Sequence, residues 1–159
     1  MAKRIRKLTA SQEDYLEAIL VLLAERPAAR VRDIARRLKV AMPSVTRSLR
    51  ALGRRGLVNY TPYEQVTLTG RGRELAEGVR SQHRVLRRFL ADVLGLDAKS
   101  ADANACRMEH AVDELVLRRI EDLNEFLSCG SAGARALRSE LRRRARRRRT
   151  SRPSQGAPT

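Results

Sequence analysis

The feature that most limits how this chain can fold is a pair of short amphipathic helices joined by a tight turn. The apolar spacing predicts helices over residues 31–38 and 42–52, with the residues between them forming the turn. Pro43 suits the first turn of the second helix, where a missing N–H leaves nothing unbonded. The alternative is an ordinary helical hairpin, but two helices joined in this way are typical of a helix-turn-helix, whose second helix enters the major groove of DNA.

A small hairpin follows the two helices. Gly56 ends the second helix, and the residue types predict strands over 57–60 and 66–69 around a turn. A helix-turn-helix followed by a hairpin is a winged helix, and this ordered combination is more specific than either part. Hydroxyl groups reach phosphates or base edges, and arginine binds guanine or phosphate. The candidate DNA-contacting residues are therefore Pro43, Ser44, Thr46, Arg47, Arg50 and Tyr63.

The charge of the chain also favours nucleic acid. The formal net charge is +16, and residues 128–159 hold ten arginines against one acidic residue. Such an excess indicates a polyanionic partner. No apolar run approaches the roughly 18 residues of a membrane span, and no apolar segment follows the basic N-terminus as in a signal peptide. Two cysteines make no disulfide framework, so we expect a reducing, cytoplasmic location without a membrane partner.

The second informative stretch is Cys106-Arg107-Met108-Glu109-His110, which lies on a helix predicted over residues 99–110. Positions i, i+3 and i+4 of a helix share one face, so the thiol, the carboxylate and the imidazole of this stretch project together. The chain has two histidines and two cysteines, and one of each lies here. The alternative is an exposed helix with a half-buried cysteine, because a free cysteine is usually a small hydrophobic residue.

Further metal-capable groups lie on two other predicted helices. Asp14 and Glu17 lie one turn apart on a first helix that begins at Thr9 or Ser11 and ends before Pro27. His83 lies at the edge of the apolar face of a long helix over 69–93. Taken alone, the acidic pair is typical of a solvated flank, and the histidine of a core edge. The apolar helices over 99–110 and 114–127 suit a dimer interface.

The segments Glu13-Asp14-Tyr15-Leu16-Glu17 and Ala105-Cys106-Arg107-Met108-Glu109-His110 resemble the diphtheria toxin repressor family of metal-activated winged-helix repressors, which has an iron branch and a manganese branch, that of MntR. The resemblance covers roughly residues 9–127. It implies a homodimeric, metal-dependent repressor of metal-uptake genes that binds double-stranded, palindromic DNA. It implies neither an enzyme nor a small organic substrate. No SH3-like domain follows, which favours the shorter manganese branch.

The resemblance also implies a set of metal ligands. These are Asp14, Glu17, His83, Cys106, Glu109 and His110. Asp14 matches a manganese-branch ligand that is Met in the iron branch, and Cys106 matches an iron-branch ligand that is Glu in the manganese branch. Carboxylates suit Mn(II), whereas imidazole and thiolate favour Fe(II), Co(II) or Zn(II). The expected cofactor is therefore a divalent transition metal, Mn(II) or Fe(II), with one or two ions per subunit.

The expected fold is mainly α, with an N-terminal winged helix-turn-helix followed by an α-helical metal-binding and dimerisation domain. The domain boundaries are a basic arm over 1–8, a DNA-binding domain over 9–72, a metal-binding and dimerisation domain over 73–127, and an Arg-rich, disordered tail over 128–159, in which the Arg-dense segment 135–149 can form a transient helix. Three alternatives stay open: a winged-helix regulator that ignores metal, a metal-dependent hydrolase, and a tail that compacts DNA without sequence preference.

Overall fold

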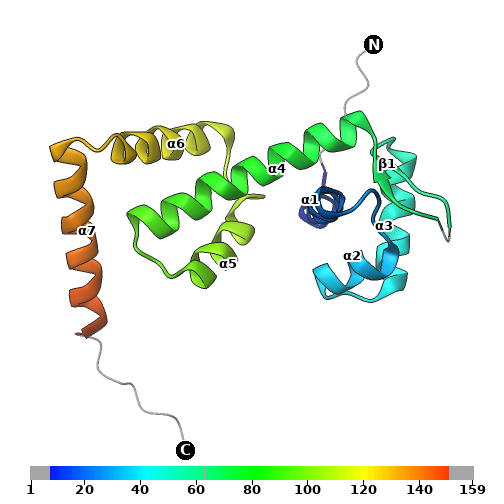
Figure 1. Cartoon of the computed structure of the whole chain (residues 1–159), viewed down its shortest axis with the longest axis horizontal. Coiled ribbons are helices and arrows are strands. Elements are labelled where there is room, and N and C mark those ends of the chain that lie inside the picture. Colours follow the sequence, from blue (N-terminus) through cyan, green and yellow to red (C-terminus); the bar gives the residue numbers. More distant parts are fainter. Residues whose placement is uncertain (1–7, 63, 151–159) are drawn as a thin grey trace, which may run out of the picture. The chain divides into compact units, whose positions relative to one another are not determined.

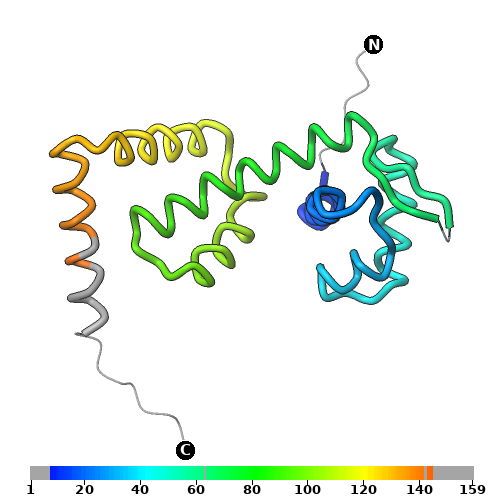
Figure 2. Tube along the Cα trace, viewed as in Figure 1, coloured from blue at the N-terminus to red at the C-terminus, as the bar shows by residue number. Residues whose placement is uncertain are grey.

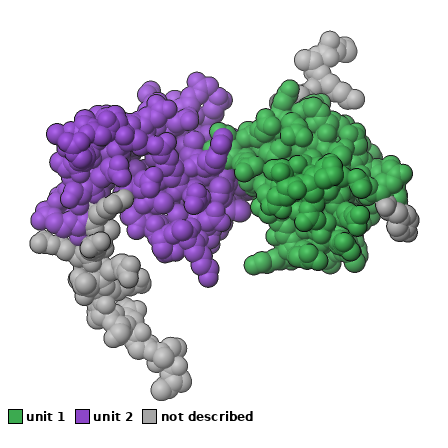
Figure 3. All heavy atoms as spheres, in the orientation of Figure 1, with its two compact units in different colours: residues 1–81 green, residues 82–159 purple. Residues whose placement is uncertain are grey.

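The computed structural model describes residues 8–62 and 64–150, and its elements are almost all helices (Figure 1). In chain order they are α1 (Ala10–Glu25), α2 (Val31–Leu38), α3 (Met42–Arg54), β1 (Val58–Asn59), β2 (Thr67–Leu68), α4 (Gly70–Arg88), the π-helix η1 (Phe89–Val93), α5 (Ala98–Met108), α6 (Glu114–Ser128) and α7 (Ala132–Thr150). They form two compact units, which divide after residue 81 within α4 (Figure 3). Among the described helices, none is long and apolar enough to cross a membrane.

Helix α1 begins and ends at the signals that the sequence carries. Thr9 and Gln12 form a capping box, in which each side chain accepts a hydrogen bond from the other residue's backbone N–H. At the other end, Arg26 is extended because the following Pro27 disfavours helical geometry before it. The predicted limits of this helix are therefore confirmed, with Thr9 as its cap.

Helices α2 and α3 form the predicted helix-turn-helix. The turn begins at Lys39, whose φ of 55° places it in the left-handed region that commonly ends a helix. Val45, Leu49 and Leu52 of α3 are fully buried and join the same core as Leu16 and other apolar residues of α1. Burial of this kind contributes about 1.5–3 kcal/mol per large apolar side chain. Packing against α1 therefore holds α3, the second helix of the helix-turn-helix, in place.

The hairpin forms as predicted but is shorter. Strands β1 and β2 are antiparallel, with Val58 opposite Leu68 and Asn59 opposite Thr67. Just before β2, the return strand pairs instead with the chain that follows α1. Ala29 and Val66 exchange two backbone hydrogen bonds, of 3.0 and 2.8 Å. Figure 2 shows the hairpin extending from the end of α3 and returning to the start of α4.

Thr69 and Gly72 fix the start of α4 against the hairpin. The Thr69 hydroxyl accepts a hydrogen bond from the Gly72 N–H at 3.0 Å and donates one to the Gly56 carbonyl at 2.8 Å. A Cβ on Gly72 would lie 1.8 Å from the carbonyl oxygen of Leu57. Only glycine allows the helix to approach the chain this closely.

The long helix predicted over 69–93 changes its hydrogen-bonding pattern near its end. Helix α4 stops at Arg88 and continues as the π-helix η1, in which the Leu94 N–H donates to the Phe89 carbonyl, five residues earlier. Gly95, with a φ of 72°, ends the segment at the predicted place. The apolar spacing did not reveal the π-helix, because Leu90 and Val93 are buried as an α-helix would also bury them.

Helices α5 and α6 begin at aspartate caps. Asp97 accepts from the Ser100 N–H at 2.9 Å, and Asp113 accepts from the Val116 N–H at 2.9 Å. Hydrogen bonds from the Ser100 side chain and backbone hold the pKa of Asp97 below its ordinary value. The core of this second unit is formed by Leu86, Leu90, Ala101 and Ala105, with partly buried apolar residues of α6 against it.

The segment after residue 130 differs from the prediction of disorder, because residues 132–150 form helix α7. Its first turn is capped by Ser131, which accepts from the Ala134 N–H, and Ala134 is fully buried. Glu140 pairs with Arg143 and Arg144 one turn later. Arginine is also a strong helix former, so the composition that indicated disorder is compatible with a helix. Most of the predicted basic arm, residues 1–7, lies outside the described residues.

Candidate metal centre and nucleic-acid interface

Helix α3 buries one face and presents the other to solvent. The exposed face carries the predicted DNA-contacting residues of this helix, all of them exposed except Thr46, which is half-buried: Pro43, Ser44, Thr46, Arg47 and Arg50. The sixth predicted residue, Tyr63, lies outside the described residues. A helix whose opposite face is buried in the core, and whose exposed face carries hydroxyl and guanidinium groups, is suited to the major groove.

A groove separates α3 from the hairpin within the first unit. Its lining consists of Arg30, Val31, Arg32, Met42, Thr46, Arg50, Tyr60, Pro62, Glu64 and Gln65. Arg30 and Arg32, which were not among the predicted residues, lie at the start of α2, the helix that packs on α3. Their position at the start of the predicted helix-turn-helix could have indicated these two residues from the sequence. With Arg50, they place three guanidinium groups along the groove against the one carboxylate of Glu64, and guanidinium groups suit the phosphate backbone.

Asp14 and Glu17 lie on α1, three residues apart and therefore on neighbouring positions of one face. Both are half-buried, whereas Tyr15 and Leu16 between them are buried in the core. The two carboxylates thus flank the apolar stripe, as the sequence predicted. They belong to the unit that carries the helix-turn-helix.

Glu109 and His110 lie at the C-terminal end of α5. The helix ends at Met108, two residues before the predicted end, and Glu109 is its C-cap. Because the Glu109 N–H still donates to the Ala105 carbonyl at 2.9 Å, Glu109 keeps helical geometry. His110 follows in the turn. The predicted patch is therefore partly helix and partly turn.

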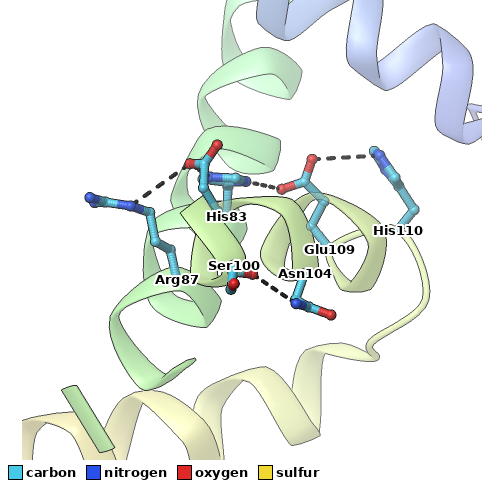
Figure 4. Close-up of polar contacts among 7 residues, drawn as sticks. His83, Arg87, Ser100, Asn104, Glu109 and His110 are labelled. Atoms are coloured by element: carbon cyan, nitrogen blue, oxygen red, sulfur yellow. Dashed lines mark hydrogen bonds and ion pairs between the residues drawn. The ribbon is translucent and has the colours of Figure 1, made fainter. Parts of the chain in front are cut away.

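The Glu109 carboxylate lies between two imidazoles (Figure 4). Oε2 is 2.7 Å from His83 Nδ1, and Oε1 is 3.5 Å from His110 Nε2. The Glu109 side chain is fully buried, and those of His83 and His110 are 16% and 14% exposed. At 2.7 Å a proton must lie between Nδ1 and Oε2, since two lone pairs would repel. A cation that bound there would displace this proton.

Cys106 adds a sulfur donor to the same group. Its Sγ and a carboxylate oxygen of Glu109 lie within 4.8 Å of each other, and Cys106 is exposed. A carboxylate, two imidazoles and a thiol are a mixed donor set. Borderline divalent ions such as Fe(II), Co(II) and Zn(II) accept all of these donors, and Mn(II) prefers the oxygen. The residues therefore fit a divalent transition metal.

The structure also places two residues beside this cluster that were not predicted. Asp102 Oδ1 lies 3.1 Å from His83 Nε2 and 3.8 Å from Arg87 Nε. Asp102 precedes Cys106 by four residues on α5, and Arg87 follows His83 by four residues on α4. Helical spacing was the signal that could have found both. Of the six predicted ligands, the second unit brings together four, His83, Cys106, Glu109 and His110.

Two family models match the chain. Residues 7–66 match the iron dependent repressor N-terminal DNA binding domain, and residues 69–135 match the iron dependent repressor metal binding and dimerisation domain. The two matches meet close to Thr69, where the winged helix ends and α4 begins. They confirm the predicted fold class, a winged helix-turn-helix followed by a helical metal-binding and dimerisation domain.

Curated relatives agree with these matches. The chain is 38% identical to an HTH-type transcriptional regulator of Methanocaldococcus jannaschii, over 72% of this chain and 92% of the relative. It is 34% identical to the diphtheria toxin repressor of Corynebacterium glutamicum, over 75% of this chain and 52% of the relative. It is 39% identical to the transcriptional regulator MntR of Escherichia coli O157:H7, over 66% of this chain and 67% of the relative. The chain thus spans about half of the diphtheria toxin repressor.

Solved structures show the same similarity. A manganese-dependent transcriptional repressor in complex with manganese is 30% identical, with a TM-score of 0.68, over 72% of this chain and 53% of that chain. The fold, the family models and the relatives agree with the resemblance found in the sequence. The chain therefore belongs to the iron-dependent repressor family of metal-responsive, DNA-binding transcriptional repressors, which includes diphtheria toxin repressor and MntR.

Proposed function

We propose that the predicted ligand set holds a divalent transition metal, Mn(II) or Fe(II), and that this ion raises the affinity of a homodimer for a palindromic operator. The proposed ligands are Asp14, Glu17, His83, Cys106, Glu109 and His110. The observation that carries the proposal is the fully buried Glu109 carboxylate, 2.7 Å from one imidazole and 3.5 Å from another. A buried carboxylate is costly unless a positive charge compensates it, and a divalent cation supplies that charge together with bonds to both rings.

The proposed coupling follows from where the ligands belong. Asp14 and Glu17 lie on α1, which shares a core with α3 and therefore moves with the DNA-reading surface. His83, Cys106, Glu109 and His110 lie in the second unit, which matches the metal-binding and dimerisation domain. Ligands from both units restrict the motion of one against the other. Two recognition helices then keep the spacing of about 34 Å that a palindrome requires.

The proposed dimer forms through α6. Four large apolar side chains of α6 lie within an arc of about 100° around the helix axis, given 100° per residue. They are exposed to solvent: Leu115 (65%), Val116 (45%), Leu123 (37%) and Phe126 (54%). The same arc also holds Arg119, which pairs with Asp122, and the apolar side chains around it form a stripe of the width that a helix typically buries. A second copy that presents the same stripe would cover it with a self-complementary contact.

The proposed targets are genes for manganese or iron uptake. The proposed location of the protein is the cytoplasm. Family members are repressors, and we propose that this chain likewise has no enzymatic activity. The donor set leaves the metal open, because Asp14 favours Mn(II) and Cys106 favours later metals. Cys106 is then the residue that sets selectivity.

The test is fluorescence anisotropy with a selected palindromic DNA at fixed salt, without metal and with Mn(II), Co(II), Zn(II) or, anaerobically, Fe(II). We expect at least one metal to tighten binding 10- to 100-fold, which corresponds to about 1.4–2.7 kcal/mol of coupling. Glu109→Ala with His110→Ala should abolish this gain, and Cys106→Glu should shift it toward Mn(II). Equal affinity with and without metal, in the wild type and in the double variant, would establish a metal-independent regulator instead.

A further inference from the structure

The His83 ring is held between two carboxylates that differ in their surroundings. Glu109, next to Nδ1, is fully buried, whereas Asp102, next to Nε2 at 3.1 Å, is 64% exposed. Because a carboxylate oxygen accepts hydrogen bonds, the 3.1 Å contact suits a ring N–H at Nε2 that donates to Asp102. The ring nitrogen that faces the buried carboxylate is Nδ1.

Asp102 is held in turn by Arg87, whose Nε lies 3.8 Å from the same Oδ1 atom. His83 and Arg87 lie one turn apart on α4, so both face the part of α5 that carries Asp102. Figure 4 shows Arg87 and His83 on the same helix, with Arg87 extending away from Glu109. The guanidinium group compensates the charge of Asp102 on the solvent side of the cluster.

We propose that Asp102 is a positioning residue for His83: it fixes the ring so that Nδ1 is the atom that binds the ion, while Arg87 keeps Asp102 in place. The inference rests on the proposed metal site. Histidines that bind metals generally donate their second ring N–H to a carboxylate, a backbone carbonyl or a water, which orients the ring and increases its basicity. Because Asp102 is engaged by His83 and Arg87, it acts through His83 and is not itself a ligand.

The first experiment measures Co(II) affinity from the visible absorption of the bound ion. Loss of such an outer partner typically weakens metal binding 10- to 100-fold, so we expect this loss in Asp102→Ala and a smaller one in Asp102→Asn, whose amide oxygen still accepts the Nε2 proton. The matched control is Asp92→Ala, which removes a comparably exposed aspartate that pairs with Arg88. The control should bind Co(II) as the wild type does.

The second experiment separates positioning from folding. In histidine-selective ¹⁵N spectra of the Zn(II)-loaded wild type, His83 should be protonated at Nε2 and bound through Nδ1, and Asp102→Ala should lose this pattern. The unfolding temperature of the metal-free variants should stay near that of the wild type, because substitutions of exposed residues usually change stability by less than about 0.5 kcal/mol.

Arg87 supplies the third test. Arg87→Gln should weaken Co(II) binding a few-fold, and the double variant with Asp102→Ala should be no weaker than Asp102→Ala alone, because Arg87 acts only through Asp102. Co(II) affinity of Asp102→Ala within two-fold of the wild type, or Zn(II) bound through Nε2 of His83, would overturn the inference and leave the metal site standing. Failure of the wild-type protein to bind Co(II) would overturn both.

Discussion

Replacing Thr69 by valine tests the junction between the hairpin and α4. Valine keeps the shape of threonine but removes the hydroxyl, which accepts from the Gly72 N–H at 3.0 Å and donates to the Gly56 carbonyl at 2.8 Å. Loss of a helix N-cap typically costs about 1 kcal/mol, and loss of a second hydrogen bond about 0.5–1.5 kcal/mol. We therefore expect the free energy of unfolding to fall by about 1.5–2.5 kcal/mol.

The assay is urea unfolding of the metal-free protein followed by far-UV circular dichroism, at one protein concentration. With a slope of about 2 kcal/mol per molar urea, the midpoint should fall by about 1 M. The matched control is Thr67→Val, whose hydroxyl accepts from the exposed Asn59 side chain, at 3.0 Å, and which should shift the midpoint much less. Equal shifts in the two variants would refute the argument that Thr69 joins the hairpin to α4.

Three further predictions concern packing, assembly and charge. Gly72→Ala should destabilise the protein by more than about 2 kcal/mol in the same urea assay, because its Cβ would lie 1.8 Å from the Leu57 carbonyl oxygen. Phe126→Glu, which places a charge on the exposed apolar stripe of α6, should convert the dimer to a monomer in sedimentation velocity, while Glu121→Gln should not. Truncation after Leu141 keeps the buried Ala134 and should make DNA affinity less dependent on salt. The slope of the logarithm of affinity against the logarithm of salt concentration should become shallower by about 0.9 for each phosphate that the shortened protein no longer neutralises.

The helices and hairpin could be predicted because their signals are local. Thr9, Pro43 and Asp113 begin helices, and the buried positions of α3 follow a helical repeat. The π-helix over residues 89–93 could not be predicted, because one wider turn leaves the apolar spacing nearly unchanged. The Arg-rich tail that contains α7 was predicted to be disordered. That expectation overlooked the Ser131 cap and the burial of Ala134, both of which depend on neighbouring structure.

The metal cluster was predictable only in part. The spacing of Cys106, Glu109 and His110 placed three donors together, but it could not show that Glu109 is buried between His83 and His110. That arrangement depends on how α5 packs against α4. Asp102 was not predicted for the same reason, since its contact with His83 joins residues 19 positions apart.

The two hydrogen bonds between Ala29 and Val66 clamp the base of the hairpin to the chain that leaves α1. Because the hairpin is fixed at its base, a small rotation of the base moves the tip of the hairpin by a larger distance. The helix that leads into Ala29 is α1, which carries Asp14 and Glu17. The wing should therefore amplify any adjustment of α1, and a fluorescent probe at the hairpin tip would register that adjustment before any DNA is bound.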